Sequence, residues 1–214
     1  MKQNLMIFGD SYSTFRGAIP EGYAVYYTGE RTSGPDVPSA DCTWWGLTLK
    51  ETDYNLVRND SWSGSTIGYT SYNGADTSKT SSFIYRLSKL EQEGFFAENR
   101  IDCVWVFGGT NDSWSNAPLG QEMTGEWTHG DLYSVLPAIG CFFDNLRKTL
   151  PDAKIYAICN CDIKEEIVTA LENACRRVGG TPIKLSAIEK DCGHPTPTGM
   201  IQIKDQVVSV LGKA

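Results

Sequence analysis

The chain has 214 residues, which is long enough for one domain, spanning 1–214, with a sizeable core. Its 26 acidic side chains outnumber the 19 basic ones, and the formal charge of −7 argues against a nucleic-acid surface or an anionic membrane partner. No apolar run approaches the roughly 20 residues of a membrane span. The apolar stretch near the N-terminus is too short for a signal peptide. We therefore expect a cytoplasmic protein.

Short apolar runs alternate along the chain with longer segments of helical periodicity. In chain order the sequence predicts a strand at 5–8, a helix at 41–49, a strand at 54–57, a helix at 82–93, a strand at 101–107, a helix at 131–150, a strand at 153–159, a helix at 162–178, a strand at 182–185 and a helix from 196–198 to 211. Segments rich in Gly, Pro, Ser and Thr separate them and predict three long loops, at 16–40, 59–81 and 108–129. The chain has no internal repeat and no linker.

Capping and breaking residues mark the ends of these helices. Asp41 and Asp162 are the expected N-caps of two of them, and Gly94 and Gly179 follow two helix ends. Pro137 lies inside the predicted helix 131–150, where it predicts a kink.

The alternation of β and α segments predicts a three-layer α/β/α fold with a five-stranded parallel sheet in the flavodoxin-like order 2-1-3-4-5. In that order the first and third strands are neighbours, and ligands bind beyond the carboxyl ends of the strands at this switch point. Ser11 follows the first strand and Asn111 the third, while His194 comes after the fifth. We expect all three to meet at one edge of the sheet.

A serine, a histidine and an aspartate at this edge indicate nucleophilic catalysis. Ser11 needs a base to take its proton, and His194 is one of only two histidines in the chain. Asp191, three residues before His194, is expected to hold the imidazole in one tautomer. The alternatives are a turn serine at Ser11 and a surface-loop histidine at His194.

Four sequence blocks carry a resemblance to a known family. They are Gly9-Asp10-Ser11, Asn59-Asp60-Ser61-Trp62-Ser63-Gly64, Gly108-Gly109-Thr110-Asn111-Asp112 and Asp191-Cys192-Gly193-His194-Pro195. In this order they resemble the conserved blocks of the SGNH hydrolase superfamily, also called GDSL-like esterases and lipases. The chain departs from the family pattern at Tyr12, where leucine is typical, and in the second block, which is spread around Trp62.

The resemblance implies a role for each block. Ser11 would be the nucleophile, with His194 and Asp191 completing the triad. The oxyanion would be stabilised by the backbone N–H groups of Ser11 and Gly64 and by the side-chain amide of Asn111. Gly64 could instead be an ordinary loop glycine.

Other polar and aromatic residues near these blocks are open to two interpretations. Asp10 and Asp112 are expected to bond loop backbone N–H groups, and His129 is expected to face solvent or lie beside the substrate, not to act as the base. Several loop aromatics could contact a substrate or could simply pack the loops onto the domain. The candidate substrate contacts are Tyr12, Trp62, Trp114 and Tyr26.

We expect a serine ester hydrolase that acts through an acyl-enzyme on small acyl esters, such as O-acetyl groups on carbohydrates. Within the family, a thioesterase, lysophospholipase or acyltransferase is the alternative, and a non-catalytic ligand-binding protein is another. Seven cysteines, an odd number, indicate free thiols. A metal site built from Cys159, Cys161, Cys192 and His194 is disfavoured, because a one-residue gap is not the usual zinc spacing. We expect no metal and no cofactor, and the sequence leaves the oligomeric state open.

Overall fold

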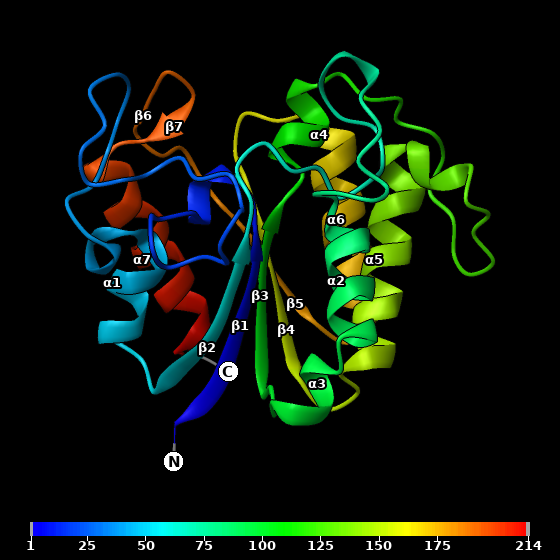
Figure 1. The fold of residues 1–214 in the computed structure, drawn as a ribbon, viewed down its shortest axis with the longest axis horizontal. Helices are drawn as coiled ribbons and strands as arrows, with labels where there is room; N and C mark the ends of the chain where they lie inside the picture. The colour runs from blue at the N-terminus through cyan, green and yellow to red at the C-terminus, as the bar shows by residue number, and fades with distance from the viewer. Residues whose placement is uncertain (1, 213–214) are drawn as a thin grey trace.

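A computed structural model describes residues 2–212 and contains a five-stranded parallel sheet in the order β2-β1-β3-β4-β5 (Figure 1). The fold class and strand order predicted from the sequence are thereby confirmed. The strands are β1 (Gln3–Gly9), β2 (Tyr54–Ser61), β3 (Cys103–Gly108), β4 (Lys154–Cys159) and β5 (Thr181–Lys184). Every residue of the central strand β3 is buried, as a strand covered on both faces requires.

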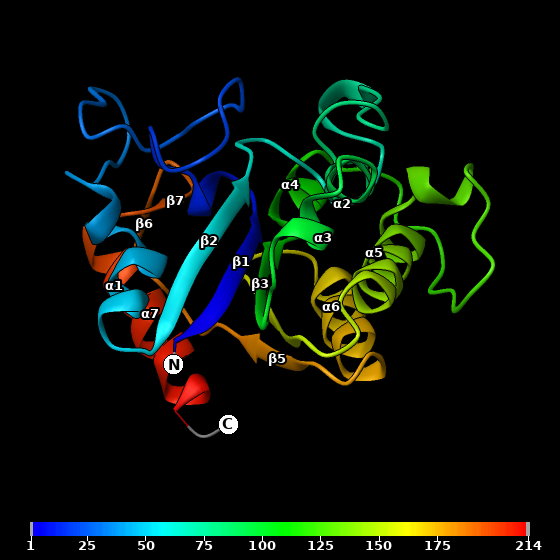
Figure 2. The same ribbon diagram turned by 60° about the horizontal axis from the view of Figure 1, so that its bottom comes forward.

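Helices cover both faces of the sheet, and Figure 2 shows the same two layers from a second direction. On one face lie α1 (Trp44–Lys50) and α7 (Pro197–Leu211); on the other lie α2 (Phe83–Gln92), α5 (Val135–Thr149) and α6 (Glu165–Arg177). Alternate residues of β1 enter different cores. Leu5 and Ile7 pack in the core on the side of α1 and α7, whereas Met6 and Phe8 pack in the other core. Strand pleating therefore divides one apolar run between two cores.

The carboxyl ends of the strands gather the segments that carry the sequence blocks. Gly9, the last residue of β1, pairs with Ser61 of β2 and with Phe107 of β3. Two small elements lie at this edge, the helix α4 (Thr110–Trp114) and an antiparallel hairpin of β6 (Lys190–Asp191) and β7 (His194–Pro195) (Figure 1). The segments that carry the sequence blocks therefore meet at the edge of the sheet that the strand order predicted.

Several helix ends differ from the predictions. Thr43, not Asp41, caps α1, and its hydroxyl accepts from the Gly46 N–H, while Asp41 lies in the preceding 3₁₀ turn Ala40–Cys42. Asp162 does not cap α6, because its backbone has a φ of 61° and Lys164 is the N-cap residue. Pro137 is the third residue of α5, in the first turn, where a backbone N–H has no helical partner to lose. The predicted kink is therefore wrong.

The predicted loops also contain short elements that the sequence did not indicate. The helix α4 interrupts the predicted loop 108–129, and α3 (Phe95–Glu98) follows the predicted stop at Gly94. The 3₁₀ turns are Ser11–Ser13, Ala40–Cys42, Tyr72–Gly74 and Asp131–Tyr133. All seven cysteines are free thiols. Among residues 2–212, no helix has the length and apolar character needed to cross a membrane.

Candidate active site

The structure brings Ser11 and His194 into hydrogen-bond contact across the carboxyl edge of the sheet. Ser11 begins a 3₁₀ turn directly after β1, and Asp10 caps this turn by accepting from the Tyr12 N–H at 3.0 Å. The Oγ atom of Ser11 lies 3.0 Å from Nε2 of His194. Only glycine fits at position 9, because a Cβ there would lie 2.7 Å from the Cβ of Ser13. Close packing at the end of β1 thus sets where the serine emerges.

The second nitrogen of the imidazole faces a backbone carbonyl. Nδ1 of His194 lies 3.2 Å from the carbonyl oxygen of Cys192, in the turn between β6 and β7. Cys192 and Gly193 have φ values of 47° and 79°, the left-handed pair typical of a tight type I′ hairpin turn. Because a carbonyl oxygen only accepts, Nδ1 carries the hydrogen and Nε2 is left as the acceptor toward Ser11. That tautomer is the one a general base requires.

The structure corrects the role expected for Asp191. Its exposed carboxylate accepts from the Sγ of Cys192 at 3.3 Å, and no hydrogen bond or ion pair between residues 2 and 212 joins it to His194. The tight turn places the Cys192 carbonyl at Nδ1, so the position that a triad carboxylate would take is already filled.

Two buried tyrosines anchor the hairpin on both sides of His194. The hydroxyl of Tyr12 donates to the Gly193 carbonyl at 2.5 Å, and the hydroxyl of Tyr27 donates to the Pro195 carbonyl at 2.8 Å. Tyr12 is completely buried and supports the hairpin. Its ring therefore has no exposed surface for the substrate contact that the sequence suggested. Tyr26 is also buried, with its ring stacked on the imidazole of His194 at a centroid distance of 3.6 Å. The sequence placed both near the site, and the structure shows both rings buried against the hairpin that carries His194.

The surroundings of His194 lower its pKa from the ordinary value of 6.5. Burial is the largest cause, the hydrogen bond to the Cys192 carbonyl opposes it, and the positive charges of Arg31 and Lys190 lower the pKa further. The imidazole is therefore neutral at pH 7 and able to accept a proton.

Asn111 and Gly64, the two expected oxyanion donors, lie on segments tied to the end of β1. Nδ2 of Asn111 donates to the Ser65 carbonyl at 3.0 Å, and its Oδ1 accepts from the Tyr72 hydroxyl at 2.8 Å. One amide N–H of Asn111 is used in this way, which leaves its second N–H for a ligand. Gly64 has a φ of 82°, which favours glycine, and a Cβ at this position would meet no atom within 4 Å.

A family model described as GDSL-like lipase/acylhydrolase matches residues 3–211. The chain belongs to this family. It is therefore a carboxylic ester hydrolase, and the predicted resemblance is confirmed.

Solved structures agree with the assignment. A GDSL-like lipase from Bacteroides ovatus has 36% sequence identity and a TM-score of 0.91, with 100% of both chains covered. Another, from Bacteroides uniformis, has 38% identity and a TM-score of 0.90, covering 100% of this chain and 97% of that one. An acetyl xylan esterase from Butyrivibrio proteoclasticus shares the fold at 19% identity and a TM-score of 0.61, covering 99% of this chain and 63% of that one. No curated protein matched the sequence.

In this GDSL-like enzyme, Arg86 is a buried residue that sequence reasoning missed. Its guanidinium is fully buried and donates to Oδ2 of Asp60 at 2.8 Å and to the Gly9 carbonyl at 3.2 Å. It lies one helical turn after Phe83 and one before Leu90, on the apolar face of α2. An arginine on the otherwise apolar face of a predicted helix is the sequence feature that could have indicated it. Its bonds join α2 to the carboxyl ends of β1 and β2, and Gly9 lies two residues before Ser11.

The two buried aspartates of the sequence blocks bond loop backbone, as predicted. Asp112 accepts from the Ile67 and Gly68 N–H groups at 3.0 and 3.3 Å, and burial raises its pKa to about 6. Burial also raises the pKa of Asp10 to about 7. One oxygen of Asp10, Oδ2, is buried without a hydrogen-bond partner in the described chain.

Two exposed aromatic side chains contact predicted site residues, Trp114 at His194 and Tyr72 at Asn111. Trp114 is 38% exposed, packs edge-on to the imidazole of His194, and is one of the predicted substrate contacts. Tyr72 is 39% exposed and was not predicted. The rings of Trp62 and Tyr23 are in tilted contact, with a centroid distance of 4.3 Å and 39° between their planes. The site therefore offers aromatic surface beside its polar groups.

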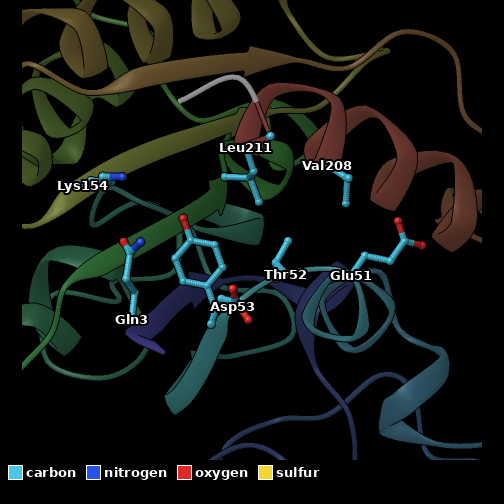
Figure 3. A pocket seen from close by; sticks show the side chains of 9 residues that line it. Gln3, Glu51, Thr52, Asp53, Lys154, Val208 and Leu211 are labelled. Carbon is cyan, nitrogen blue, oxygen red and sulfur yellow. The ribbon is translucent and has the colours of Figure 1, made fainter. Parts of the chain in front are cut away.

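Two other features lie away from the catalytic groups. His129 is exposed and packs against the rings of Tyr69 and Tyr133, and it makes no contact with Ser11. A pocket of about 250 Å³ lies at the opposite, amino edge of the sheet, between Gln3, Asp53 and Leu211 (Figure 3). Among residues 2–212, no group of three or more His, Cys, Asp or Glu side chains is placed to hold a metal ion.

Proposed function

We propose that this esterase uses Ser11 as its nucleophile and His194 as its general base. The observation that carries the proposal is the 3.0 Å contact between Oγ and Nε2, with the tautomer set by the Cys192 carbonyl. Oγ attacks the ester carbonyl carbon while its proton passes to Nε2. The alcohol then leaves with that proton, and the acyl group remains on Ser11. Water, deprotonated by His194, releases the acid and restores the serine.

We propose that the oxyanion formed in each half-reaction is stabilised by three donors. They are the backbone N–H groups of Ser11 and Gly64 and the free N–H of the Asn111 amide. The bond from Tyr72 to Oδ1 supports this role for Asn111, because it directs the oxygen away and leaves Nδ2 to donate. Each donor of this kind is worth roughly 10²- to 10³-fold in rate.

We propose small acyl esters on a carbohydrate, acetyl groups above all, as the substrate class. The exposed rings of Trp114, beside His194, and Tyr72, beside Asn111, suit stacking against a sugar, whose C–H face is apolar. The structural neighbour from Butyrivibrio proteoclasticus is an acetyl xylan esterase, which supports the same class.

Hydrolysis of p-nitrophenyl esters from acetyl to decanoyl, and of acetylated xylan, tests the proposal. We expect activity on acetyl esters and on the polysaccharide, with a loss of several orders of magnitude in Ser11→Ala. Ser209→Ala is the matched control, because this serine lies on α7 and donates to the Gln206 carbonyl. Equal activity in wild type and Ser11→Ala would refute the nucleophile. Activity confined to long acyl chains would refute the substrate class.

A further inference from the structure

The imidazole of His194 is the first layer of a three-layer stack. Its ring lies 3.6 Å from the ring of Tyr26, with only 7° between the two planes. The guanidinium carbon of Arg31 lies 3.9 Å from the centre of the same tyrosine ring. Two groups this close to one ring centre do not fit on one face, so imidazole and guanidinium sandwich Tyr26.

Hydrogen bonds hold the Tyr26 and Arg31 layers of the stack in place. Nε of Arg31 donates to the Ser33 carbonyl at 2.6 Å, and its backbone N–H donates to Oδ2 of Asp36 at 2.7 Å. The backbone N–H of Tyr26 donates to Oγ1 of Thr14 at 2.9 Å, which ties the stack to the turn after β1. The stack is therefore built into the fold before any substrate arrives.

The stack supplies what the Nδ1 hydrogen bond alone does not. A carboxylate partner would both orient the imidazole and attract the imidazolium, whereas Cys192 offers a single neutral carbonyl at 3.2 Å. One hydrogen bond sets the tautomer but constrains the plane of the ring weakly. A flat contact at 3.6 Å fixes that plane and keeps Nε2 directed at Ser11.

We propose that Tyr26 is a positioning residue for His194 and that Arg31 holds Tyr26 in place from its other face. The proposal rests on the role proposed above for His194 as the base. It assigns Tyr26 to the machinery of proton transfer and not to substrate binding.

Several charged or titratable groups face His194 and bear on the pH dependence of this arrangement. The hairpin contributes Lys190, Asp191 and Cys192, and the loop 16–40 contributes Arg31 in addition to Tyr26. The turn after β1 contributes the hydroxyls of Ser11 and Tyr12. Of the charged groups, Arg31 and Lys190 both lower the pKa of His194. Removing the guanidinium should therefore raise this pKa and move the acid limb of activity to higher pH.

Histidine NMR tests the stack without reference to activity, because the chain has only two histidines. His129→Gln assigns the two sets of ring signals. We expect the His194 ring protons upfield of their positions in the unfolded chain, since they lie over the face of Tyr26. This shift should remain in Tyr26→Phe and disappear in Tyr26→Leu. Unchanged His194 shifts in Tyr26→Leu would overturn the stack.

Kinetics with p-nitrophenyl acetate tests the positioning role. We expect Tyr26→Leu to lower kcat about 10- to 100-fold with little change in KM, while Tyr26→Phe retains activity. Tyr54→Leu is the matched control for lost burial, because Tyr54 and Tyr26 are both 9% exposed and Tyr54 lies at the opposite edge of the sheet. Arg31→Gln should shift the acid limb upward, and Arg31→Lys should restore it.

The outcomes separate this proposal from the proposed function. If Tyr26→Leu keeps wild-type kcat, or falls no further than Tyr54→Leu, the positioning role is overturned although the esterase mechanism stands. If Ser11→Ala is as active as wild type, the proposed function fails, and the NMR result still reports on the stack.

Discussion

The substitution Asp191→Asn distinguishes the observed arrangement from a carboxylate triad. In a Ser-His-Asp triad this change costs about 10⁴-fold in kcat, because the histidine takes the wrong tautomer. Here the tautomer is set by the Cys192 carbonyl, which the substitution leaves in place. The remaining effect of Asp191 on His194 is the attraction of an exposed carboxylate for the imidazolium formed during catalysis.

The pairing of the hairpin gives the size of that attraction. Asp191 and His194 are directly paired across β6 and β7, and the Cβ atoms of such pairs are about 5 Å apart. Two unit charges at about 5 Å in water interact by ~0.8 kcal/mol, which corresponds to roughly a fourfold change in rate. We therefore expect Asp191→Asn to reduce kcat/KM by less than about tenfold.

The assay is kcat/KM for p-nitrophenyl acetate at pH 8, where His194 is neutral in both proteins. Asp152→Asn is the control, because Asp152 is an exposed aspartate near the amino edge of the sheet. A loss of 10³-fold or more in Asp191→Asn, with Asp152→Asn unchanged, would show that the carboxylate orients the base and would refute this reasoning.

Three further predictions follow from the buried polar groups. Asn111→Ala should lower kcat by about 10²- to 10³-fold with little effect on KM, measured on the same ester, and an unchanged kcat would exclude the amide from the oxyanion site. Asp10 has its pKa raised from 3.8 to about 7 in the folded state, so folding binds a proton in this range and stability falls as pH rises from 4 to 7. Asp10→Asn should remove that fall, which is worth at most ~3 kcal/mol between pH 5 and pH 8 in urea unfolding; equal pH dependence in both proteins would contradict it. Arg86→Met removes one of two arginine partners of the buried Asp60 carboxylate, since Arg58 stays within 2.8 Å of it, and should cost about 1–3 kcal/mol of stability by the same method, whereas unchanged stability would contradict the buried ion pair.

The strand order and the convergence of the four blocks were predictable because they depend on long-range rules. Apolar runs of strand length separated by helices leave few topologies, and the carboxyl edge of a parallel sheet collects whatever follows its strands. Ser11, Asn111 and His194 lie where this argument put them. Their positions follow from the order of the strands and helices, and an error of several residues in a predicted helix end does not change that order.

The errors came where one local contact decides the outcome. Thr43 caps α1 in place of Asp41 because a preceding 3₁₀ turn shifts the helix start by two residues. Asp191 was expected at Nδ1 from its spacing and from the family resemblance, but the turn conformation of Cys192 and Gly193 brings a carbonyl there instead. The periodicity of apolar residues does not predict the φ angle of a single turn residue, so this part of the site could be seen only in the structure.

The aromatic residues show a similar division. The sequence placed Tyr12 and Tyr26 near the site, but composition does not say whether a ring faces solvent or packs on a histidine. Both proved buried, and each contacts the hairpin that carries His194. Tyr72 was missed because it lies in a Gly- and Ser-rich stretch that predicts only a loop, and its link to Asn111 is a tertiary contact.

Covalent labelling tests the central claim, that Ser11 is a nucleophile activated by His194, most directly. The protein is treated with a p-nitrophenyl alkylphosphonate, and the modified peptide is identified by mass spectrometry. The account predicts one phosphonyl group, on Ser11, with labelling at least 10³-fold slower in His194→Ala. Labelling of a different residue, or equal labelling of wild type and His194→Ala, would contradict it.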